Sequence, residues 1–484
     1  MKKLYTFFTA LFFFTGLSAQ APSWMYEYTF GAGHNELFRH SYEHPDGGYI
    51  TISSYDTSSC NCGTPTLVKT DYYGNHEWLN MPLANDSSVF ASNVSMAPLT
   101  NGYIIAAEKV DSNSTYQYYM NLVYQKDIFL IRTDLYGDTM WTKELFITPV
   151  SAREYAHSIR VASDGGYIMA GVLVDTLVLN GHLLVVKTDS AGNIDWTYRT
   201  PAQWPLMSYN VEEAPNGDFV FLCGQGPDRL LRLSSTGSLV YDNVNISGPM
   251  GMLSVTNAYN GGFMTSGESS NGLGIMRLND LGDTIWTMQH PFAGHPVTSG
   301  TSISRTLDSN YVIAGFTYNS SMDTIVAYAC KMDTSGTILW ENAYTLPGAS
   351  NMRGVDVIPT SDYGYLITGA NFTGTWNGVL IKIDSTGYCA IPPLSIGHPA
   401  AQSSTLEVYP NPAADQFTVT LSNWNGEMLY VELFDMTGRK QMSDRLSTAQ
   451  TNISTASLSN GLYLVQVKNS EGRVLHDSKL VVKR

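Results

Sequence analysis

The sequence predicts an all-β protein, in which a seven-bladed β-propeller is followed by an Ig-like β-sandwich. The first observation is a ten-residue pattern that occurs seven times, with Lys or Arg first, Asp third, Gly sixth and Trp tenth. Successive copies start 63, 55, 45, 45, 54 and 51 residues apart. A repeat of this length is typical of propeller blades.

The copies of this pattern start at Lys69, Arg132, Lys187, Arg232, Arg277, Lys331 and Lys382. Four are complete, two vary at the Asp or Trp position, and the last ends before its Trp. A second signal, an aromatic residue that mostly follows an Asp-Gly or Asn-Gly turn, also occurs seven times: Tyr49, Tyr103, Tyr167, Phe219, Phe263, Tyr311 and Tyr365. Because the two signals agree in number, we expect seven equivalent units.

One repeat, residues 156–200, predicts a four-stranded antiparallel meander. An extended run at 156–160 is joined to a second strand at 167–171 by a Gly-rich turn, since Gly tolerates the positive φ that tight turns need. The apolar run 183–186 is typical of a strand buried on both faces. After a turn comes a fourth strand, 194–200, whose Trp196 we expect to pack between neighbouring blades.

The two ends of the repeat region complement one another. The seventh copy runs through Lys382 to Gly387 without reaching a Trp, whereas residues 23–30 contain Trp24 and follow no repeat. We therefore expect this N-terminal strand to be the outer strand of the last blade, which closes the ring and leaves no free sheet edge. An open β-solenoid and two stacked sandwiches are the alternatives, and neither needs such a completion.

The ends of the chain predict export. A basic start, an apolar stretch and small residues before Gln20 are typical of a signal peptide, assigned to residues 1–19. The propeller is assigned to 20–389, a Pro-, Ala- and Ser-rich linker to 390–405 and the second domain to 406–484. No other stretch is long and apolar enough to predict an integral membrane protein. Five cysteines are too few for a disulfide framework, and the state of Cys60, Cys62 and Cys389 stays open.

The acidic charge of the chain lies in the predicted ring. Residues 406–484 hold eight basic and eight acidic residues, and two more Lys belong to the signal peptide. The remainder has 17 basic and 34 acidic residues, about 17 net negative charges. Such a surface repels phosphates, so nucleic acid is not an expected partner.

The C-terminal region predicts a small antiparallel sandwich, because four alternating runs are separated by Gly turns. Its motifs follow in a fixed order: Tyr409-Pro410-Asn411-Pro412, then residues 433–438 ending in Gly438, then residues 458–463 with Gly461 and Tyr463. Together they resemble the type A C-terminal sorting domain of the type IX secretion system of Bacteroidota. A generic Ig-like binding module is the alternative.

This resemblance implies several properties. The partner is the type IX secretion machinery, reached by way of the periplasm. Loss of the domain then leads to release or to attachment to surface lipopolysaccharide, so the expected location is secreted or on the outer-membrane surface. The ring region resembles the uncharacterised repeat regions that often precede such domains, which implies a fold and no activity.

The sequence contains no motif for a cofactor, a metal or a catalytic centre. His34, His40 and His44 lie near the first blade, but histidines in a surface loop do not by themselves predict a metal site. We therefore expect a binding protein. The alternatives are a glycan hydrolase or lyase that uses carboxylates at the channel mouth, and a structural spacer of an adhesin.

Aromatic residues outside the repeat predict a binding face. The loops between second and third strands and between blades share one face of a propeller, and here they hold Trp204, Trp376, Tyr116 and Tyr118. Exposed aromatic rings anchor ligands, so we expect a glycan or a protein at these residues. Their alternative role is to cap the blades. Four polar residues of the first strands are expected to line the channel: His40, Asn93, Asn210 and Arg353.

Overall fold

The structure is a computed structural model that is all-β. It describes residues 23–30, 35–56, 63–83, 86, 88–118, 121–147, 152–175, 181–201, 207–224, 228–244, 251–318, 321, 323–349, 351–389, 406–421, 429–435, 440–446, 448, 450–456, 458–469 and 474–483. The predicted signal peptide and linker lie outside these residues. Within them, we find no helix of the length and apolar character needed to span a bilayer.

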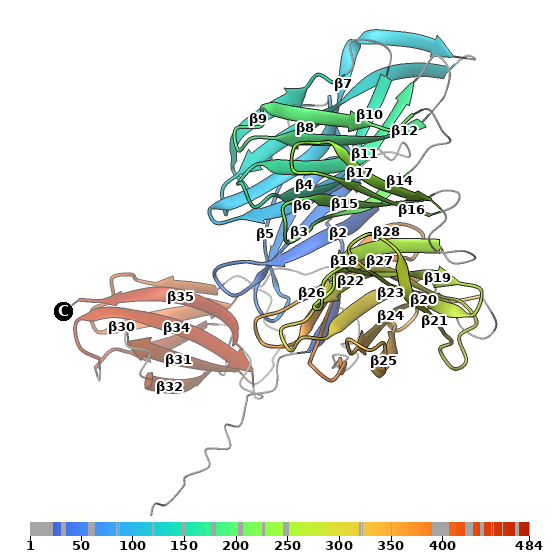
Figure 1. Ribbon diagram of the computed structural model, residues 1–484. Coiled ribbons are helices and arrows are strands. Elements are labelled where there is room, and N and C mark those ends of the chain that lie inside the picture. Colours follow the sequence, from blue (N-terminus) through green and yellow to red (C-terminus); the bar gives the residue numbers. More distant parts are fainter. Residues whose placement is uncertain are drawn as a thin grey trace, which may run out of the picture. The chain divides into compact units, whose positions relative to one another are not determined.

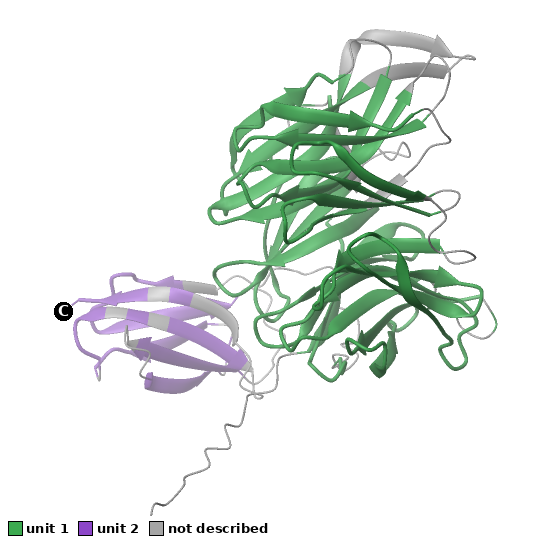
Figure 2. Ribbon diagram, viewed as in Figure 1, with its two compact units in different colours: residues 1–392 green, residues 393–484 purple. Residues whose placement is uncertain are grey.

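The chain forms two compact units, Met1–Pro392 and Pro393–Arg484 (Figure 2). The described strands of unit 1 form three four-stranded and two eight-stranded sheets. Each eight-stranded sheet consists of two antiparallel meanders that a single bridge joins, Arg153 to Lys126 in one and Glu268 to Ser299 in the other, so the strands make up seven meanders. Meander 1 holds β2 (Asn35–Glu43), β3 (Tyr49–Asp56), β4 (Thr64–Thr70) and β5 (His76–Asn80). Meander 2 holds β6 (Val89–Leu99), β7 (Gly102–Tyr118), β8 (Asn121–Thr133) and β9 (Thr139–Leu145). Meander 3 holds β10 (Ala152–Val161), β11 (Tyr167–Asp175), β12 (Gly181–Thr188) and β13 (Ile194–Arg199).

The next meanders continue in chain order. Meander 4 holds β14 (Met207–Glu213), β15 (Phe219–Gly224), β16 (Arg229–Leu233) and β17 (Leu239–Val244). Meander 5 holds β18 (Gly251–Asn257), β19 (Phe263–Ser269), β20 (Gly272–Leu278) and β21 (Thr284–His290). Meander 6 holds β22 (Thr298–Arg305), β23 (Tyr311–Tyr318), β24 (Ile325–Met332) and β25 (Ile338–Tyr344). Meander 7 holds β26 (Met352–Pro359), β27 (Tyr365–Phe372), β28 (Trp376–Ile383) and, from the N-terminus, β1 (Trp24–Tyr28).

The basic residue of the repeat is buried and holds the first turn of its own meander. In meander 3, Lys187 Nζ bonds Asp164 Oδ2 at 2.7 Å and the Thr188 carbonyl at 3.0 Å. A buried ammonium group needs such partners. The same pairing joins Lys69 to Asp46, Lys331 to Asp308 and Lys382 to Asp362. The Asp-Gly turn and the Lys therefore recur together because they form one structural unit.

The Trp of one meander packs on the turn of the next. Trp196 Nε1 donates to the Ser235 carbonyl at 3.1 Å. A Cβ atom added to Gly237 would lie 2.7 Å from the Trp196 ring, and Gly237 has a φ of 81°. Only glycine suits both conditions. The expected packing of this Trp between neighbouring units is therefore confirmed.

Meander 7 takes its outer strand from the N-terminus, as the sequence predicted. Strand β1 pairs antiparallel with β28 and sets Trp24 opposite Lys382. Within one repeat, Lys187 stands opposite Trp196 in the same way. Trp24 Nε1 donates to the Tyr72 carbonyl at 3.2 Å, which ties the closing strand to meander 1. Trp24 therefore occupies the place of the missing seventh Trp.

Side-chain hydrogen bonds join the first strand of each meander to the next. They link Tyr42 to Met96, Ser95 to Ile159, Arg160 to Glu212, Glu212 to Asn257, Ser254 to Ile303, Ser302 to Asp356, and Asp356 to His40. This cycle passes through all seven meanders and returns to meander 1. The first and last meanders therefore lie side by side. In Figure 1, β2 (blue) is close to β26 and β28.

Glu36 at this closure is buried, and its pKa is raised. Its Oε1 accepts the Phe30 N–H at 2.7 Å, and its Oε2 has no partner among the described residues. Burial raises the pKa of Glu36 from 4.5 to about 7. The negative charge of Glu27 adds to this increase, and the hydrogen bond from Phe30 reduces it. Because the folded-state pKa is the higher one, ionisation of Glu36 lowers stability as the pH rises between these two values.

We therefore expect Glu36→Gln to raise the free energy of unfolding by about 3 kcal/mol at pH 8, where wild-type Glu36 is charged. At pH 4 the two proteins should unfold alike, because Glu36 is then protonated in both states. Urea unfolding at the two pH values measures both. An equal gain at both pH values would point to a cause other than ionisation.

Unit 2 consists of two sheets around one apolar core. One sheet has the order β29 (Leu406–Tyr409), β30 (Gln416–Leu421) and β33 (Gln450–Ser454). The other has β32 (Lys440–Leu446), β31 (Leu429–Asp435), β34 (Gly461–Asn469) and β35 (Val474–Val482). Both sheets contribute to the core, with Phe417 and Ile453 from the first and Val431, Val465 and Leu480 from the second.

Candidate functional site

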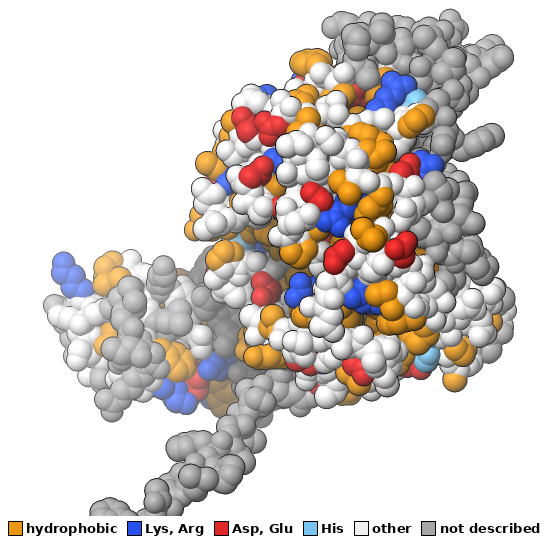
Figure 3. All heavy atoms as spheres, in the orientation of Figure 1, with side chains coloured by type: hydrophobic (Ala, Val, Ile, Leu, Met, Phe, Trp, Pro, Cys, Tyr) orange, Lys and Arg blue, Asp and Glu red, His pale blue; other side chains and the backbone are white. Residues whose placement is uncertain are grey.

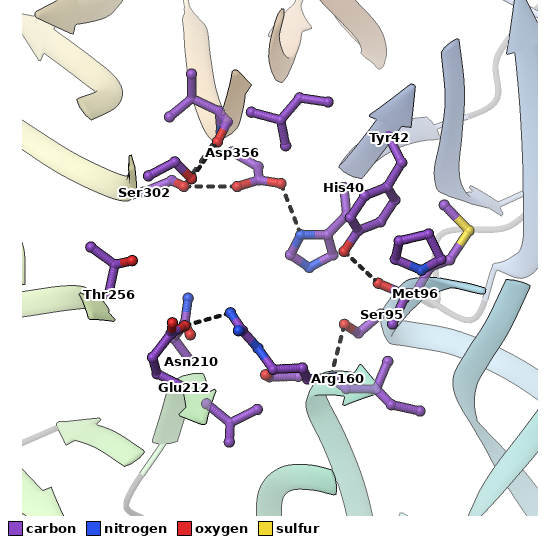
Figure 4. Close-up of a pocket in the computed structure, with 18 of the residues that line it drawn as sticks. His40, Tyr42, Ser95, Met96, Arg160, Asn210, Glu212, Thr256, Ser302 and Asp356 are labelled. Atoms are coloured by element: carbon purple, nitrogen blue, oxygen red, sulfur yellow. Dashed lines mark hydrogen bonds and ion pairs between the residues drawn. The ribbon is translucent and has the colours of Figure 1, made fainter. Parts of the chain in front are cut away.

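A cavity of about 380 Å³ lies among the first strands of all seven meanders (Figure 4). All seven of these strands contribute to its polar lining, which includes His40, Ser95, Ser158, Arg160, Asn210, Glu212, Thr256, Ser302 and Asp356. Cavities of small-molecule sites have this order of volume and a few convergent polar groups. We therefore treat the cavity as the first candidate site of unit 1.

A shared irregularity places these polar side chains. In each first strand, the register with the second strand shifts by one or more residues, and the next paired residue is polar. These residues are His40, Ser95, Ser158, Asn210, Ser254, Ser302 and Asp356. A bulge re-aims the side chain that follows it. All but Ser254 line the cavity.

Both carboxylate oxygens of Asp356 are hydrogen-bonded to neighbouring side chains. Its Oδ2 lies 3.2 Å from His40 Nδ1, and its Oδ1 accepts the Ser302 hydroxyl at 2.7 Å. Burial alone would raise the pKa of Asp356, but the bonds from His40 and Ser302 outweigh burial and hold the pKa below its usual value. Asp356 is therefore an ionised acceptor at neutral pH, and His40 Nδ1 carries the proton that it donates.

Glu212 forms a second polar chain across the cavity wall. Its Oε2 accepts from Arg160 and its Oε1 accepts from Asn257 Nδ2 at 2.7 Å. Burial raises the pKa of Glu212, and the Arg160 charge only partly offsets this. Figure 4 shows Arg160 and Glu212 facing one another, with His40 and Asp356 on another side of the same space.

An aromatic cluster with Arg353 lies at the other end of meander 7. Strand β26 contributes its later residues, 356–358, to the cavity, whereas Arg353 is near its start. The guanidinium of Arg353 lies 5.0 Å from the Phe316 ring centre and 5.9 Å from that of Trp376. The rings of Trp376 and Phe372 are 5.2 Å apart, and Phe372 is 37% exposed. The cluster thus lies at the end of β27 and the start of β28, and none of its four residues lines the cavity.

The structure describes some of the residues that the sequence predicted at a binding site, and others lie outside the described part of the chain. Trp376 is half-buried in the cluster with Arg353. Trp204 lies outside the described residues, and so do the side chains of Tyr116 and Tyr118, whose backbone belongs to β7. Of the four polar residues expected to line the channel, His40 and Asn210 do so. Arg353 instead contacts Phe316, and the Asn93 side chain is outside the described part of the chain.

Sequence reasoning missed Arg160, Glu212 and Asp356. For Asp356 a signal was nevertheless present, because the polar residue after the bulge precedes the second-strand aromatic residue by nine positions in six repeats and by eight in the second. Arg160 and Glu212 each lie two residues after such a position. His40 before Tyr49 is one example. The spacing fixes a position in the ring, but whether that position faces the cavity depends on the bulge.

The histidines do not gather into a metal site in the described structure. His34 is outside it, whereas His44 is buried in the first turn, where Nδ1 lies 2.7 Å from Asp46. Among the described residues, no group of three or more His, Cys, Asp or Glu side chains is placed to hold a metal ion. Acidic and basic side chains are interspersed over the face of unit 1 in Figure 3.

The motifs of unit 2 lie where strands meet. Asn411 Oδ1 accepts the Val481 N–H at 2.9 Å, and Tyr463 donates its hydroxyl to the Ser459 carbonyl at 2.8 Å. Tyr409 is exposed, and its hydroxyl accepts from Gln450 at 2.7 Å. Pro410, Pro412 and Gly461 are exposed, and Gly438 lies outside the described residues.

Residues 407–483 match the family model described as the secretion system C-terminal sorting domain. Unit 2 is a type IX secretion sorting domain. The sorting domain indicates a substrate of type IX secretion and export to the cell surface or secretion. None of the curated proteins matches the sequence.

Solved structures resemble the whole chain only distantly. A protein of unknown function from Dyadobacter fermentans has a TM-score of 0.46 at 10% identity, over 74% of this chain and 97% of that one. A Trypanosoma rangeli sialidase mutant has 0.43 at 10%, over 96% and 88%. PorZ, a surface component of the type IX secretion system of Porphyromonas gingivalis, has 0.28 at 9%, over 92% and 81%. All three TM-scores are below 0.5.

Proposed function

We propose that this chain is an exported binding protein, in which a seven-bladed β-propeller binds a glycan through its loop face and an Ig-like sorting domain directs export. The cycle of hydrogen bonds through the first strands, together with the pairing of β1 and β28, supports the closed seven-membered ring. We further propose that a signal peptide at residues 1–19 brings the chain to the periplasm. After removal of the sorting domain, the ring is released or attached to lipopolysaccharide.

The cluster around Trp376 carries the binding proposal. It joins an exposed phenyl ring, Phe372, to an indole ring and a guanidinium. Aromatic faces stack on the apolar face of a sugar ring, and Arg donates to its oxygen atoms. Nε of Arg353 bonds Asn351 at 3.1 Å, whereas its two Nη atoms have no hydrogen-bond partner among the described residues. The cluster therefore offers stacking surface and donors together.

Hydrolysis is less well supported than binding. A glycosidase needs one carboxyl group that protonates the leaving oxygen and another that attacks or activates water. In the cavity, both oxygens of Asp356 and both of Glu212 already accept hydrogen bonds from the protein. Nor does any observation favour a purely structural spacer over a binding protein.

A glycan array probed with the full chain tests the proposal. We expect Trp376→Ala and Arg353→Gln each to weaken binding of the captured glycan by at least about tenfold, since each removes one of the two contacts. Trp204→Ala tests the second predicted Trp. Tyr136→Ala is the matched control. Tyr136 is 70% exposed and lies in the turn between β8 and β9, whereas Trp376 follows the connection between β27 and β28. Binding that ignores both cluster variants, or no binding at all, would reject the site, and a protein partner would then be the alternative.

The sorting domain gives a separate prediction. Removal of residues 406–484 should leave the chain inside the cell envelope, because the machinery loses its recognition unit, whereas the Trp376→Ala chain should reach the surface or medium normally. Immunoblots of periplasm, surface and medium measure this. Normal delivery of the truncated chain would contradict a sorting role.

A further inference from the structure

Polar groups from several meanders converge in the cavity among the first strands. It lies toward the ends of the first strands that lead into the tight turns, since it takes residues 40 and 42 from β2 and 356–358 from β26. It is therefore distinct from the cluster around Trp376. Some polar groups of the cavity lining are hydrogen-bonded to the protein and others are not, and this difference indicates the kind of ligand.

The charged groups of the cavity are largely compensated by one another. Arg160 is paired with Glu212, and Asp356 with His40 and Ser302. A carboxylate ligand would meet the charges of Asp356 and Glu212, and a cation would meet that of Arg160. The arrangement therefore disfavours a charged ligand of either sign.

Other polar groups of the lining have no hydrogen-bond partner in the described part of the chain. His40 bonds Asp356 through Nδ1 and has no partner at Nε2, which in a neutral imidazole with its proton on Nδ1 is an acceptor. No hydrogen bond is found for the Asn210 amide, the Thr256 hydroxyl or the Ser158 hydroxyl, although all three residues line the cavity. Arg160 uses one of its nitrogens for Glu212 and keeps further N–H donors. The cavity thus presents unpaired acceptors and donors side by side.

We propose that this cavity binds a neutral polyhydroxylated molecule the size of a monosaccharide. A hydroxyl group both donates and accepts, so one molecule with several hydroxyls matches a wall of mixed polarity. One ligand hydroxyl donates to His40 Nε2, while others accept from Arg160 and from the Asn210 amide. Asp356 is a positioning residue here, because it fixes the tautomer of His40 without touching the ligand.

Saturation-transfer NMR on the full chain tests this proposal, with D-glucose, D-galactose, D-mannose and N-acetyl-D-glucosamine as probes. We expect a signal from at least one sugar, and a loss of at least about tenfold in its affinity in both His40→Ala and Asn210→Leu. Asn210→Leu keeps the volume of the side chain and breaks no protein hydrogen bond, so it stays informative where His40→Ala disturbs folding. Trp376→Ala should leave the signal unchanged.

The outcomes that contradict the cavity proposal can be distinguished from a failure of glycan binding at the cluster around Trp376. No saturation transfer from any of the four sugars overturns the proposal. An unchanged affinity in folded Asn210→Leu overturns it too, because the amide would then not contact the ligand. A signal that disappears only in Trp376→Ala assigns the sugar to the loop face, which supports the proposed function and rejects the cavity as a site.

Discussion

Replacing Trp24 by Ala should lower the free energy of unfolding of the chain by about 3–5 kcal/mol, the usual cost of removing a buried indole. Trp24 is 4% exposed, its ring centre lies 5.4 Å from that of Tyr26 and 6.0 Å from that of Tyr49, and its Nε1 bonds meander 1. The substitution removes contacts on both sides of the closure. Urea unfolding, followed by tryptophan fluorescence and far-UV circular dichroism, measures the loss.

Tyr136→Ala is the control for Trp24→Ala. Tyr136 also belongs to the repeat region, but it is 70% exposed, so its removal should change stability by no more than about 0.5 kcal/mol. If the two variants unfolded at the same urea concentration, Trp24 would not be part of a closing contact.

Asp362→Asn should be nearly as damaging, by about 3–5 kcal/mol, because it leaves a buried ammonium without its counter-charge. Lys382 is fully buried, and its Nζ lies 2.9 Å from Asp362 Oδ2. Burial by itself would raise the pKa of Asp362, but the bonds from Thr360 and Lys382 outweigh burial and lower it. The stability that this pairing contributes is therefore present above the unfolded-state pKa near 3.9 and is lost as the pH falls through the lower folded-state value.

The matched control is Asp164→Asn in meander 3. Asp164 pairs with Lys187 in the same way, but it is 60% exposed, and Lys187 has Asp195 as a second partner at 3.6 Å. Its loss should therefore be about 1 kcal/mol. Thermal melts of both variants at pH 7 and pH 3 measure the contrast. A loss for Asp362→Asn that is as large at pH 3 as at pH 7 would show that charge is not the cause.

The strand pattern of unit 1 could be predicted because its signals are local. Each Lys, Asp and Trp of the repeat acts within one meander or on the next one, so spacing alone locates it. The missing Trp after Lys382 even pointed to Trp24, more than 350 residues away, and the two stand opposite one another. What the sequence did not suggest is that the Lys and the Asp-Gly turn are one unit, since residues such as Asp164 and Lys187 are 23 positions apart.

The cavity was harder to predict because it depends on bulges. Alternation along a strand assigns every second residue to one face, and each register shift in a first strand reverses that assignment. Arg160 and Glu212 come from different meanders and meet only when the first strands are adjacent. By contrast, Trp376 could be singled out from the sequence because it lies outside the repeat, and its role in binding stays a prediction. Its association with Arg353 and Phe316 required the structure.

Disulfide cross-linking of the closing strand tests the central claim most directly. Glu27 stands opposite Val379 in the pairing of β1 with β28, whereas Leu380 points to the other face of the sheet. In a chain whose five natural cysteines are replaced, Glu27→Cys with Val379→Cys should form a bond under mild oxidation, and Glu27→Cys with Leu380→Cys should not. Equal cross-linking in both pairs, or none in the first, would contradict closure of the ring by its N-terminal strand.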